Sequence, residues 1–450
     1  MIKNREELIR GVEGAELLLN AIEETLRSVQ PDILVERSLR VKGDELVIET
    51  HERKEKFNLK NFDKIYIIGW GKASGLMAES AEKILPVADG IVNILKGTHF
   101  DVKKVKLQEA EHPIPGRGSF DGTRRILEFT ERITGNDLIV CLISGGGSAL
   151  LSQPIDGLRL EEKQEVVDKL MKAGANINEL NTVRKHLSKV KGGRLAKKLY
   201  PATIINLIIS DVVSDPLDVI SSGPTVPDKS TFSDAKQVLV KYGLWNDSDA
   251  ARIIEKGING LIDETPKEGD SVFRKVYSFI IGSNEAAVLA ASEYLKSQGV
   301  KHQLIRNIQG DARNAGRVFA GLLKKGKSFV AGGETTVKVT GKGMGGRNQE
   351  IALSCALEIA GLENVLFTSF GTDGIDGNSP ADGAVVDGST TDRGKKIGVD
   401  PSKFQSNNDS YSFFKKTGSC MITGPTRTNV NDVMIGIAPQ AKKRILFHLS

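Results

Sequence analysis

The sequence predicts an α/β protein of two domains, and three observations carry this prediction. The chain has 450 residues, and at roughly 100–200 residues per domain this length predicts two or three domains. Short apolar runs alternate with segments of helical periodicity, which is the pattern of parallel strands covered on both faces by helices. Its 47 glycines make up about a tenth of the chain, against the usual ~7%. Many of them follow the apolar runs, where α/β sheets bind ligands.

The first series of elements predicts a parallel sheet. Residues 6–29 place apolar side chains near helical spacing and predict one amphipathic helix. The charged stretch 32–60 predicts a hairpin or a linker, and residues 73–84 predict a helix. Buried strands are predicted at 64–68, 90–95, 137–143 and 202–210. Because these strands are apolar throughout, we expect residues 1–265 to form a Rossmann-like, doubly wound, mostly parallel sheet.

A polar stretch around Thr265 marks the expected domain boundary, and a second α/β domain is predicted over residues 266–450. Its strands are predicted at 277–281, 303–306, 328–331, 335–340 and 365–369. Its helices are predicted at 284–298, 311–325 and 347–359. Residues 433–437 and 444–447 predict further strands at a sheet edge. We expect a ligand-binding cleft between the two domains.

Composition argues against several classes of protein. The chain has 62 basic and 57 acidic residues for a net charge of +5, and aromatic residues make up 5%. This disfavours nucleic acid as a partner, since there is neither a dense basic face nor a set of stacking platforms. No run approaches the ~20 apolar residues of a membrane span, and the first ten residues are too polar for a signal peptide. Three distant cysteines form no disulfide framework. We expect a cytoplasmic protein that acts on a small anion.

Lys72 is the first candidate for chemistry. It lies in the segment GWGKAS, after a predicted strand and at the start of a predicted helix. A helix N-terminus offers free N–H groups and positive potential to an anion, and a lysine there adds a full charge. The P-loop pattern is not met, because no glycine lies five residues before Gly71 and Ala73 follows the lysine. A lysine that merely covers the helix start is an equally weighted alternative.

A serine–glycine run follows the next apolar strand and predicts a second anion site. Three glycines between serines at a strand-to-helix turn form a nest of backbone N–H groups that suits a carboxylate or a phosphate. The residues are Ser144, Gly145, Gly146, Gly147 and Ser148. The nucleophile-elbow pattern of hydrolases is not met, because the second glycine is absent. The alternative is a tight turn without a ligand.

Arg347 is the third candidate. It follows a glycine-rich segment in which Gly341, Gly343 and Gly346 satisfy the dinucleotide pattern G-x-G-x-x-G. An arginine in the first turn of a helix is unfavourable unless an anion neutralises it. It therefore predicts a contact with a phosphoryl group or a carboxylate, and a structural arginine is the alternative. The nucleotide phosphates are expected at Gly343, Gly345, Gly346 and Asn348.

Carboxylates at strand ends are the fourth set. Asp211 and Asp373 both follow predicted strands, the latter in the loop GTDGIDGN. Such carboxylates suit Mg²⁺ binding or the positioning of a hydroxyl group, and helix capping or turn formation is the alternative. His112 is expected to be structural or to contact substrate rather than a metal. The basic run 184–191 is expected to be a solvated face, although it could steer an anion.

Taken together, these motifs resemble the glycerate kinases whose C-terminal half is called the MOFRL domain. The matching segments run in order from about residue 64 to 440. They are GWGKAS, EAEHPIPGRGS, LISGGGSALL, NINELNTVRKHLSKVKGGRLA, SDVVSDPLDVISSGPTVPD, GGETTVKVTGKGMGGRNQE, FGTDGIDGNSPADGAVVDG and TGPTRTNVNDV. Together the segments are highly specific, although any one of them alone would be weak. The resemblance implies a MOFRL-type C-terminal domain.

The resemblance also implies an activity and roles for residues. It implies transfer of the γ-phosphoryl group of ATP to the 2-hydroxyl of D-glycerate with Mg²⁺. Lys72 and Arg347 fall on positions that look catalytic in the family, and both are expected to bind substrate together with Ser148. Asp211 and Asp373 are expected to bind the metal or to activate the hydroxyl. The expected partners are D-glycerate and a nucleotide, and a homodimer is left open.

Two other functions compete with this one. An NAD(P)-dependent hydroxypyruvate reductase is supported by the glycine pattern, but Asp373 lies beyond the ~20-residue spacing at which an acidic residue would contact the ribose. A non-catalytic protein that binds a small anion would explain the nests but not the density of charged residues at strand ends. Within the kinase class, transfer to the 3-hydroxyl is the alternative.

Overall fold

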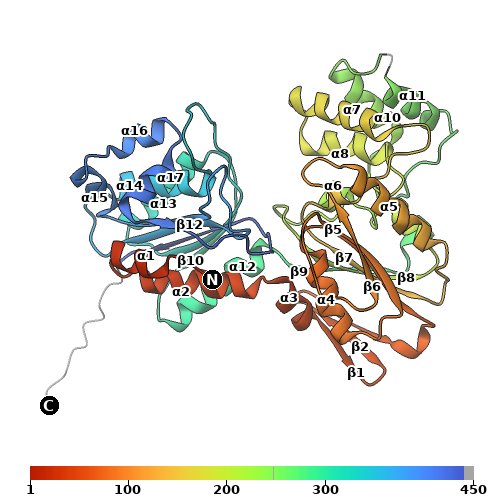
Figure 1. Cartoon of the computed structure of the whole chain (residues 1–450), viewed down its shortest axis with the longest axis horizontal. Coiled ribbons are helices and arrows are strands. Elements are labelled where there is room, and N and C mark those ends of the chain that lie inside the picture. Colours follow the sequence, from red (N-terminus) through yellow and green to blue (C-terminus); the bar gives the residue numbers. More distant parts are fainter. Residues whose placement is uncertain (247, 440–450) are drawn as a thin grey trace. The chain divides into compact units, whose positions relative to one another are not determined.

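The computed structural model describes residues 1–246 and 248–439. The chain divides into two compact units (Figure 1). Unit 2 spans Pro31–Gly282, and unit 1 combines Met1–Gln30 with the chain from Ser283 onward. Each unit is built around its own six-stranded sheet. No helix of the described residues is both long and apolar enough to cross a membrane.

The sheet of unit 2 is parallel and has the strand order β6-β5-β4-β7-β8-β9. Its strands are β4 (Ile65–Trp70), β5 (Asp89–Leu95), β6 (Val105–Ala110), β7 (Leu138–Ile143), β8 (Thr203–Ile209) and β9 (Val276–Gly282). Every residue of β4, β7 and β8 is buried, which explains their unbroken apolar sequences. The strand order reverses between β4 and β7, and this reversal is the point at which doubly wound sheets bind ligands.

Helices cover both faces of this sheet. On one side lie α3 (Pro31–Ser38) and α4 (Ser74–Ile84), and on the other lie α5 (Arg117–Thr130) and α9 (Arg194–Leu199). A small antiparallel sheet is formed by β1 (Leu39–Lys42), β2 (Glu45–Glu49) and β3 (Lys54–Asn58). Short helical turns are α6 (Gly147–Leu150), η1 (Leu59–Asn61), η2 (Ile220–Ser222) and η3 (Ser271–Phe273).

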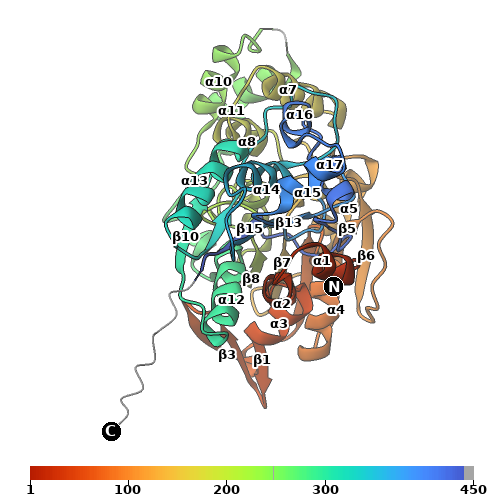
Figure 2. The same cartoon turned by 90° about the vertical axis from the view of Figure 1, so that its left-hand side faces the viewer.

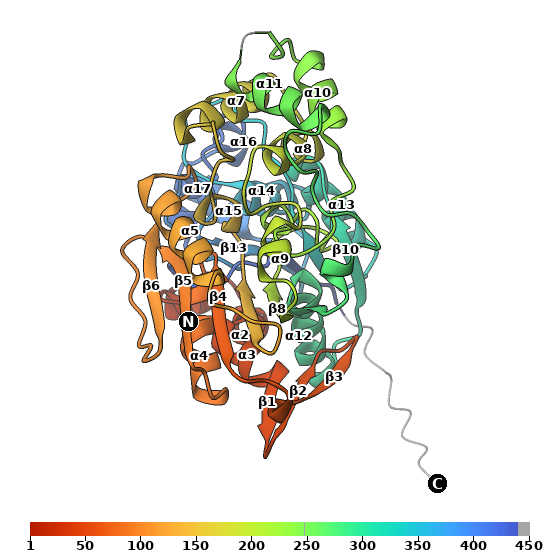
Figure 3. The ribbon, with the colours of Figure 1, turned by 90° about the vertical axis from the view of Figure 1, so that its right-hand side faces the viewer.

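Four further helices gather at one end of unit 2 (Figure 3). They are α7 (Leu160–Lys172), α8 (Ile177–His186), α10 (Phe232–Lys241) and α11 (Asp249–Ile258). They share an apolar cluster that includes Leu170, Leu187, Phe232 and Leu239, each almost fully buried. Because they pack on one another, they form a helical layer beyond the end of the parallel sheet.

Unit 1 has the strand order β10-β11-β15-β12-β13-β14. The strands are β10 (Gln303–Ile308), β11 (Phe329–Gly333), β12 (Leu366–Gly371), β13 (Gly383–Asp387), β14 (Cys420–Met421) and β15 (Asp432–Ile437). Only the β10–β11 pair is parallel, and the remaining pairs are antiparallel. The sheet core includes the rings of Phe319, Phe329 and Phe367, which contact one another.

The helices of unit 1 also lie on both sides of its sheet. Helices α2 (Ala15–Ser28) and α12 (Asn284–Ser297) lie side by side on one face (Figure 2). Helices α13 (Ala312–Lys324) and α14 (Arg347–Glu358) contribute to the core on the other face. The remaining helices are α1 (Arg5–Gly11), α15 (Thr390–Lys396), α16 (Pro401–Ser406) and α17 (Ser410–Thr417).

The predicted α/β class, with a parallel sheet followed by a second α/β unit, is confirmed. The compact units divide the chain elsewhere than at Thr265. Strand β9 lies in unit 2 because it pairs with β8, and residues 1–30 lie in unit 1 because α2 packs on α12.

Several predicted elements differ from the structure. The helix predicted over 6–29 is two helices, because Gly14 adopts a left-handed φ of 74° between them. The stretch 32–60 does contain the hairpin that was one of its two predicted forms, as the antiparallel strands of the small sheet, but it also contributes to α3, which was not predicted. Residues 335–340 form no strand, since β15 occupies the place beside β11. Residues 433–437, predicted at a sheet edge, belong to β15. This strand is central because it pairs with β11 on one side and β12 on the other. The strand predicted at 444–447 lies outside the described residues.

Candidate functional site

The loops that follow β4 and β7 are joined at the point where the strand order reverses. The backbone N–H of Lys72 donates to the carbonyl of Gly145 at 2.9 Å, and the N–H of Ala73 donates to Ser144 Oγ at 3.0 Å. Gly71 has a φ of 128°, and a Cβ there would overlap Ser144. The predicted lysine loop and the predicted serine–glycine loop are therefore joined by hydrogen bonds and lie side by side.

The glycines of these two loops are required by close packing. A Cβ on Gly145 would overlap the carboxylate of Asp211, and a Cβ on Gly147 would overlap Ser221 Oγ. Gly146 adopts a φ of 77°. Asp211 follows β8 and is half-buried, so the structure brings the carboxylate at the end of β8 against the loop at the end of β7. Three of the predicted features, Lys72, the serine–glycine loop and Asp211, lie together.

The side chain of Lys72 is half-buried beside His112. A Cβ built on Gly146 would lie 3.2 Å from Lys72 Cε and 2.9 Å from His112 Cδ2. Burial, and then the charge of Lys72, lowers the pKa of His112 to about 4. The imidazole is therefore neutral near pH 7, and the positive charge at this position belongs to Lys72.

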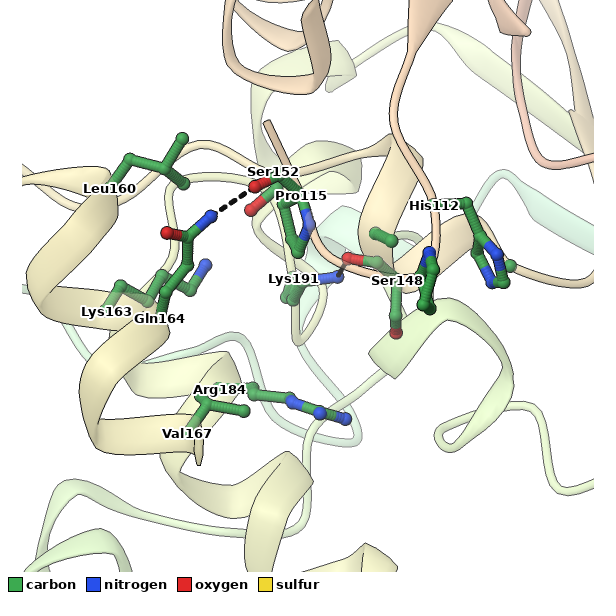
Figure 4. A pocket seen from close by; sticks show the side chains of 13 residues that line it. His112, Pro115, Ser148, Ser152, Leu160, Lys163, Gln164, Val167, Arg184 and Lys191 are labelled. Carbon is green, nitrogen blue, oxygen red and sulfur yellow. Dashed lines mark hydrogen bonds between the residues drawn. The ribbon is translucent and has the colours of Figure 1, made fainter. Parts of the chain in front are cut away.

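A cavity of about 230 Å³ lies behind the serine–glycine loop, within unit 2 (Figure 4). It is lined by His112, Pro113, Pro115, Gly146, Ser148, Ala149, Ser152, Leu160, Lys163, Gln164, Val167, Arg184 and Lys191. Its three cationic side chains were not among the predicted site residues. Only the basic run 184–191 contained a signal for two of them. That run is not a solvated face, because Lys185, His186 and Lys191 are buried.

The two lysines of this pocket are almost completely shielded from solvent. Lys163 is 5% exposed and Lys191 is 2% exposed. Lys191 Nζ donates to the carbonyls of Ser148 at 3.0 Å and Ser221 at 3.3 Å. Lys163 Nζ has no hydrogen-bond partner within the described part of the chain. Within the same residues, none of Lys163, Arg184 and Lys191 forms an ion pair with a carboxylate, whereas Lys185 is paired with Asp228 at 3.1 Å.

These surroundings change the protonation of the two lysines. Burial, and then the charge of Arg184, lowers the pKa of Lys163 to about 7. Burial, followed by the charges of Lys163 and Arg184, lowers the pKa of Lys191 well below its usual range. An anion in the pocket would favour the charged form of both groups.

Arg347, the first residue of α14, is held by carboxylates of unit 1. Its Nε and Nη2 atoms donate to the two carboxylate oxygens of Asp432 at 2.6 and 2.9 Å, and its Nη1 lies 3.1 Å from Glu334. Burial alone would lower the pKa of Arg347, but the hydrogen bonds and charge of Asp432 outweigh burial and raise it. The anion that the sequence predicted for this arginine is thus partly supplied by the protein, and 32% of the side chain stays exposed.

The N-terminus of α14 also has an internal carboxylate. Asp376 accepts hydrogen bonds from the backbone N–H groups of Asn348 at 3.1 Å and Gln349 at 2.9 Å. Burial is the largest influence on Asp376 and raises its pKa to about 6. The side-chain oxygen of Asn348 accepts from Ser369 at 2.6 Å. These N–H groups are therefore not free donors for a phosphate.

The glycine-rich segment before α14 is fixed by the polar groups of its own unit. The N–H of Gly343 donates to the carbonyl of Asn407, and that of Gly345 donates to Asn378 Oδ1, both at 2.9 Å. No strand leads directly into the segment, so the strand–turn–helix context of the dinucleotide pattern is missing. The roles of Gly343, Gly345, Gly346 and Asn348 in phosphate binding stay predictions.

Asp373 lies half-buried in the loop after β12, where its Oδ1 accepts from the N–H of Ile375 at 3.2 Å. Asp373 belongs to unit 1 and Asp211 to unit 2. Among the described residues, no group of three or more His, Cys, Asp or Glu side chains could hold a metal ion. Mg²⁺ is commonly bound by one or two carboxylates and by substrate phosphates. Asp211 or Asp373 fits that mode, whereas an all-protein cage does not fit.

Comparisons with known proteins identify the family of this chain. Residues 17–255 match the domain of unknown function DUF4147, and residues 327–432 match the MOFRL family. The chain is 41% identical over 411 residues to the D-glycerate 2-kinase of Thermotoga maritima, covering 88% of this chain and 96% of that protein. It is 40% identical over 443 residues to the glycerate 2-kinase of Pyrococcus horikoshii, covering 95% and 98%.

The chain is also similar to a protein of solved structure and to a relative that carries a different name. The crystal structure of glycerate kinase from Thermotoga maritima matches with a TM-score of 0.84 at 38% identity, covering 94% of this chain and 99% of that one. A protein of Agrobacterium vitis named putative hydroxypyruvate reductase is 37% identical over 382 residues, covering 82% of this chain and 85% of that protein.

We predict that Lys163→Met stabilises the free protein at neutral pH by about 1–4 kcal/mol, the range found when buried ionic groups give way to apolar ones. The folded pKa of about 7 lies below the usual 10.5, so the unfolded state binds more protons between these values. The stability of the unsubstituted protein should therefore rise over this pH range, and the advantage of the variant should shrink.

Thermal unfolding at several pH values tests this. Lys169→Met, an exposed residue of the same helix paired with Glu165, is the control. A variant less stable than the control at pH 7 would contradict the prediction.

We also predict that Asp432→Asn destabilises unit 1 by about 1.5–3 kcal/mol, the worth of hydrogen bonds to a charged group. The reason is that Asp432 is fully buried and bonds Arg347 through both oxygens. Glu334→Gln is the matched control, because this second partner is 41% exposed and should contribute less than about 1 kcal/mol. Chemical denaturation measures both variants. Equal losses would show that the bidentate contact has no special weight.

Proposed function

We propose that this chain, which belongs to the MOFRL-domain glycerate kinase family, transfers the γ-phosphoryl group of ATP to the 2-hydroxyl of D-glycerate. The observation that carries the proposal is its similarity, along nearly the whole of both chains, to a D-glycerate 2-kinase. The anion-binding character of the site in unit 2 supports it. A cytoplasmic location and a possible homodimer are further predictions.

The residues of unit 2 suit phosphoryl transfer. This reaction requires little covalent chemistry from the protein and depends on positioning and on neutralisation of charge. Lys72 lies where the strand order reverses, with a neutral His112 beside it, so its ammonium group would neutralise charge on the phosphoryl oxygens. The carboxylate of Asp211, against the serine–glycine loop, would accept the proton of the attacking hydroxyl or bind the metal.

Arg347 and Asp373 are the corresponding candidates in unit 1. Asp432 and Glu334 fix the direction of the Arg347 guanidinium while part of it stays exposed, so it would offer an oriented positive charge to a phosphoryl group. Asp373 is the alternative to Asp211 for the hydroxyl proton or for the metal. Mg²⁺, when bound with the nucleotide, would neutralise phosphate charge.

The proposed reaction predicts a single product. With ATP, Mg²⁺ and D-glycerate, the purified protein should form a phosphomonoester whose ³¹P signal is coupled to one proton, as in 2-phosphoglycerate. Coupling to two protons would identify the 3-phosphate and would contradict attack by the 2-hydroxyl. Intact ATP without a new signal would remove D-glycerate as the substrate.

A hydroxypyruvate reductase is the second candidate function, because one relative carries that name. Against it, the Gly341–Gly346 segment is fixed by its own unit and lacks the context of a dinucleotide site. The two functions are separated by measuring, from the absorbance of NADH or NADPH, whether hydroxypyruvate oxidises the cofactor. If no cofactor is oxidised and the phosphomonoester is formed, the kinase function stands and the reductase function is excluded.

We predict that Lys72→Ala lowers kcat/KM for D-glycerate by more than about tenfold, which is 1.4 kcal/mol of transition-state stabilisation. The reason is the loss of the charge at the strand-order reversal. Lys83→Ala is the control, since Lys83 lies in the last turn of α4, is exposed and pairs with Glu79. Steady-state kinetics on both variants test the role. A loss below tenfold in Lys72→Ala would show that the charge is not used.

A further inference from the structure

The pocket behind the serine–glycine loop holds positive charge that the proposed chemistry does not use. Figure 4 shows Lys163 and Gln164 on α7 facing the pocket from one side, with Ser148 and His112 on the other. Arg184 comes from α8, and Lys191 from the segment after it. Lys163 is the decisive group, because it is 5% exposed, faces the cavity and has no partner for its Nζ among the described residues.

An anion would balance the positive charge of the pocket. A buried charge without a partner is unfavourable, and within the described chain no carboxylate is paired with Lys163, Arg184 or Lys191. Burial, followed by the neighbouring cationic charges, lowers the pKa values of both lysines. An entering carboxylate would offer Lys163 the partner that it lacks, and it would match the planar fork of Arg184.

We propose that this pocket binds the carboxylate of the hydroxy acid that accepts the phosphoryl group, with Lys163 and Arg184 as its direct partners. This inference rests on the proposed function, and it adds the residues that select an acid over a neutral alcohol. Lys191 acts as a positioning residue, since its Nζ donates to the carbonyls of Ser148 and Ser221 and so holds the loop beside the pocket.

The size and lining of the pocket favour a small acid over a nucleotide. Its volume of about 230 Å³ is below the roughly 300–1,000 Å³ of sites that hold drug-sized ligands. Among the described residues, no Phe, Tyr or Trp ring lines it to stack on a base, whereas Ser148 and Ser152 offer polar groups to the hydroxyls of a short acid.

The position of the pocket connects it with the proposed chemistry. Gly146 and His112 form part of its wall, and the Lys72 side chain lies against the same two residues. An acid whose carboxylate lies between Lys163 and Arg184 would therefore have its hydroxyl groups toward the side of the pocket where Lys72 lies.

The first test separates the two substrates kinetically. Lys163→Met should raise KM for D-glycerate by about tenfold or more, as expected for loss of a charge-assisted hydrogen bond, and should leave KM for ATP within about twofold. Arg184→Gln should have the same effect. Lys169→Met, on the exposed side of α7, should change neither value. Circular dichroism and thermal unfolding of each variant verify folding.

The second test is a readout that a structural role would not change. D-glycerate is titrated into the full-length protein near pH 8 by calorimetry, in two buffers with different ionisation enthalpies. The unsubstituted protein should take up protons on binding, because the carboxylate restores the charge on Lys163. Lys163→Met should take up fewer protons.

Each other outcome overturns the inference. An unchanged KM for D-glycerate with unchanged proton uptake would show that the pocket does not bind the acid. A raised KM for ATP alone would assign the cations to the nucleotide phosphates. If the unsubstituted protein neither binds nor phosphorylates D-glycerate, the proposed function fails as well. The phosphorylation assay on the unsubstituted protein thus distinguishes the two failures.

Discussion

The site of unit 2 depends on one contact, the joining of the loops that follow β4 and β7. These strands pair in parallel register, Trp70 beside Ile143, so their loops leave the sheet at the same edge. The hydrogen bonds from Lys72 and Ala73 to the serine–glycine loop then set where Lys72 and Asp211 lie. Gly71 leaves no room for a Cβ at this contact, and Cβ atoms on Gly145 and Gly147 would overlap Asp211 and Ser221. Close packing, and not only the approach of a ligand, therefore explains the glycines of these two loops.

The sequence predicted buried strands where a purely local property suffices. A parallel strand covered on both faces is apolar at every position, and β4, β7 and β8 show this directly. The central place of β15 was not predictable in this way, because it depends on pairing with β11 and β12, which lie far away in the chain. The segment 335–340 has the composition of a strand, but among the described residues no neighbouring strand pairs with it, and local pattern does not contain that information.

The residues of the site divide in the same way, into those that the local sequence pattern predicts and those that depend on contacts distant in the chain. Lys72, the serine–glycine loop and Asp211 were recognisable because each directly follows an apolar strand. Lys163 was not, because the sequence of α7 places it among charged residues, and its burial depends on the segments packed around that helix. Arg347 was recognised as needing an anion, but its carboxylate, Asp432, lies on a strand distant in the sequence.

The two units compensate their positive charge in opposite ways, and this difference has a functional meaning. In unit 1, Asp432 and Glu334 neutralise Arg347, which fixes the direction of the guanidinium at little electrostatic cost. In unit 2, the pocket cations have no carboxylate partner within the described chain, so their burial is electrostatically unfavourable. A protein tolerates such a loss of stability where a ligand removes it. The uncompensated pocket is thus the part of the molecule whose stability should respond most strongly to a bound anion, while the compensated arginine should respond little.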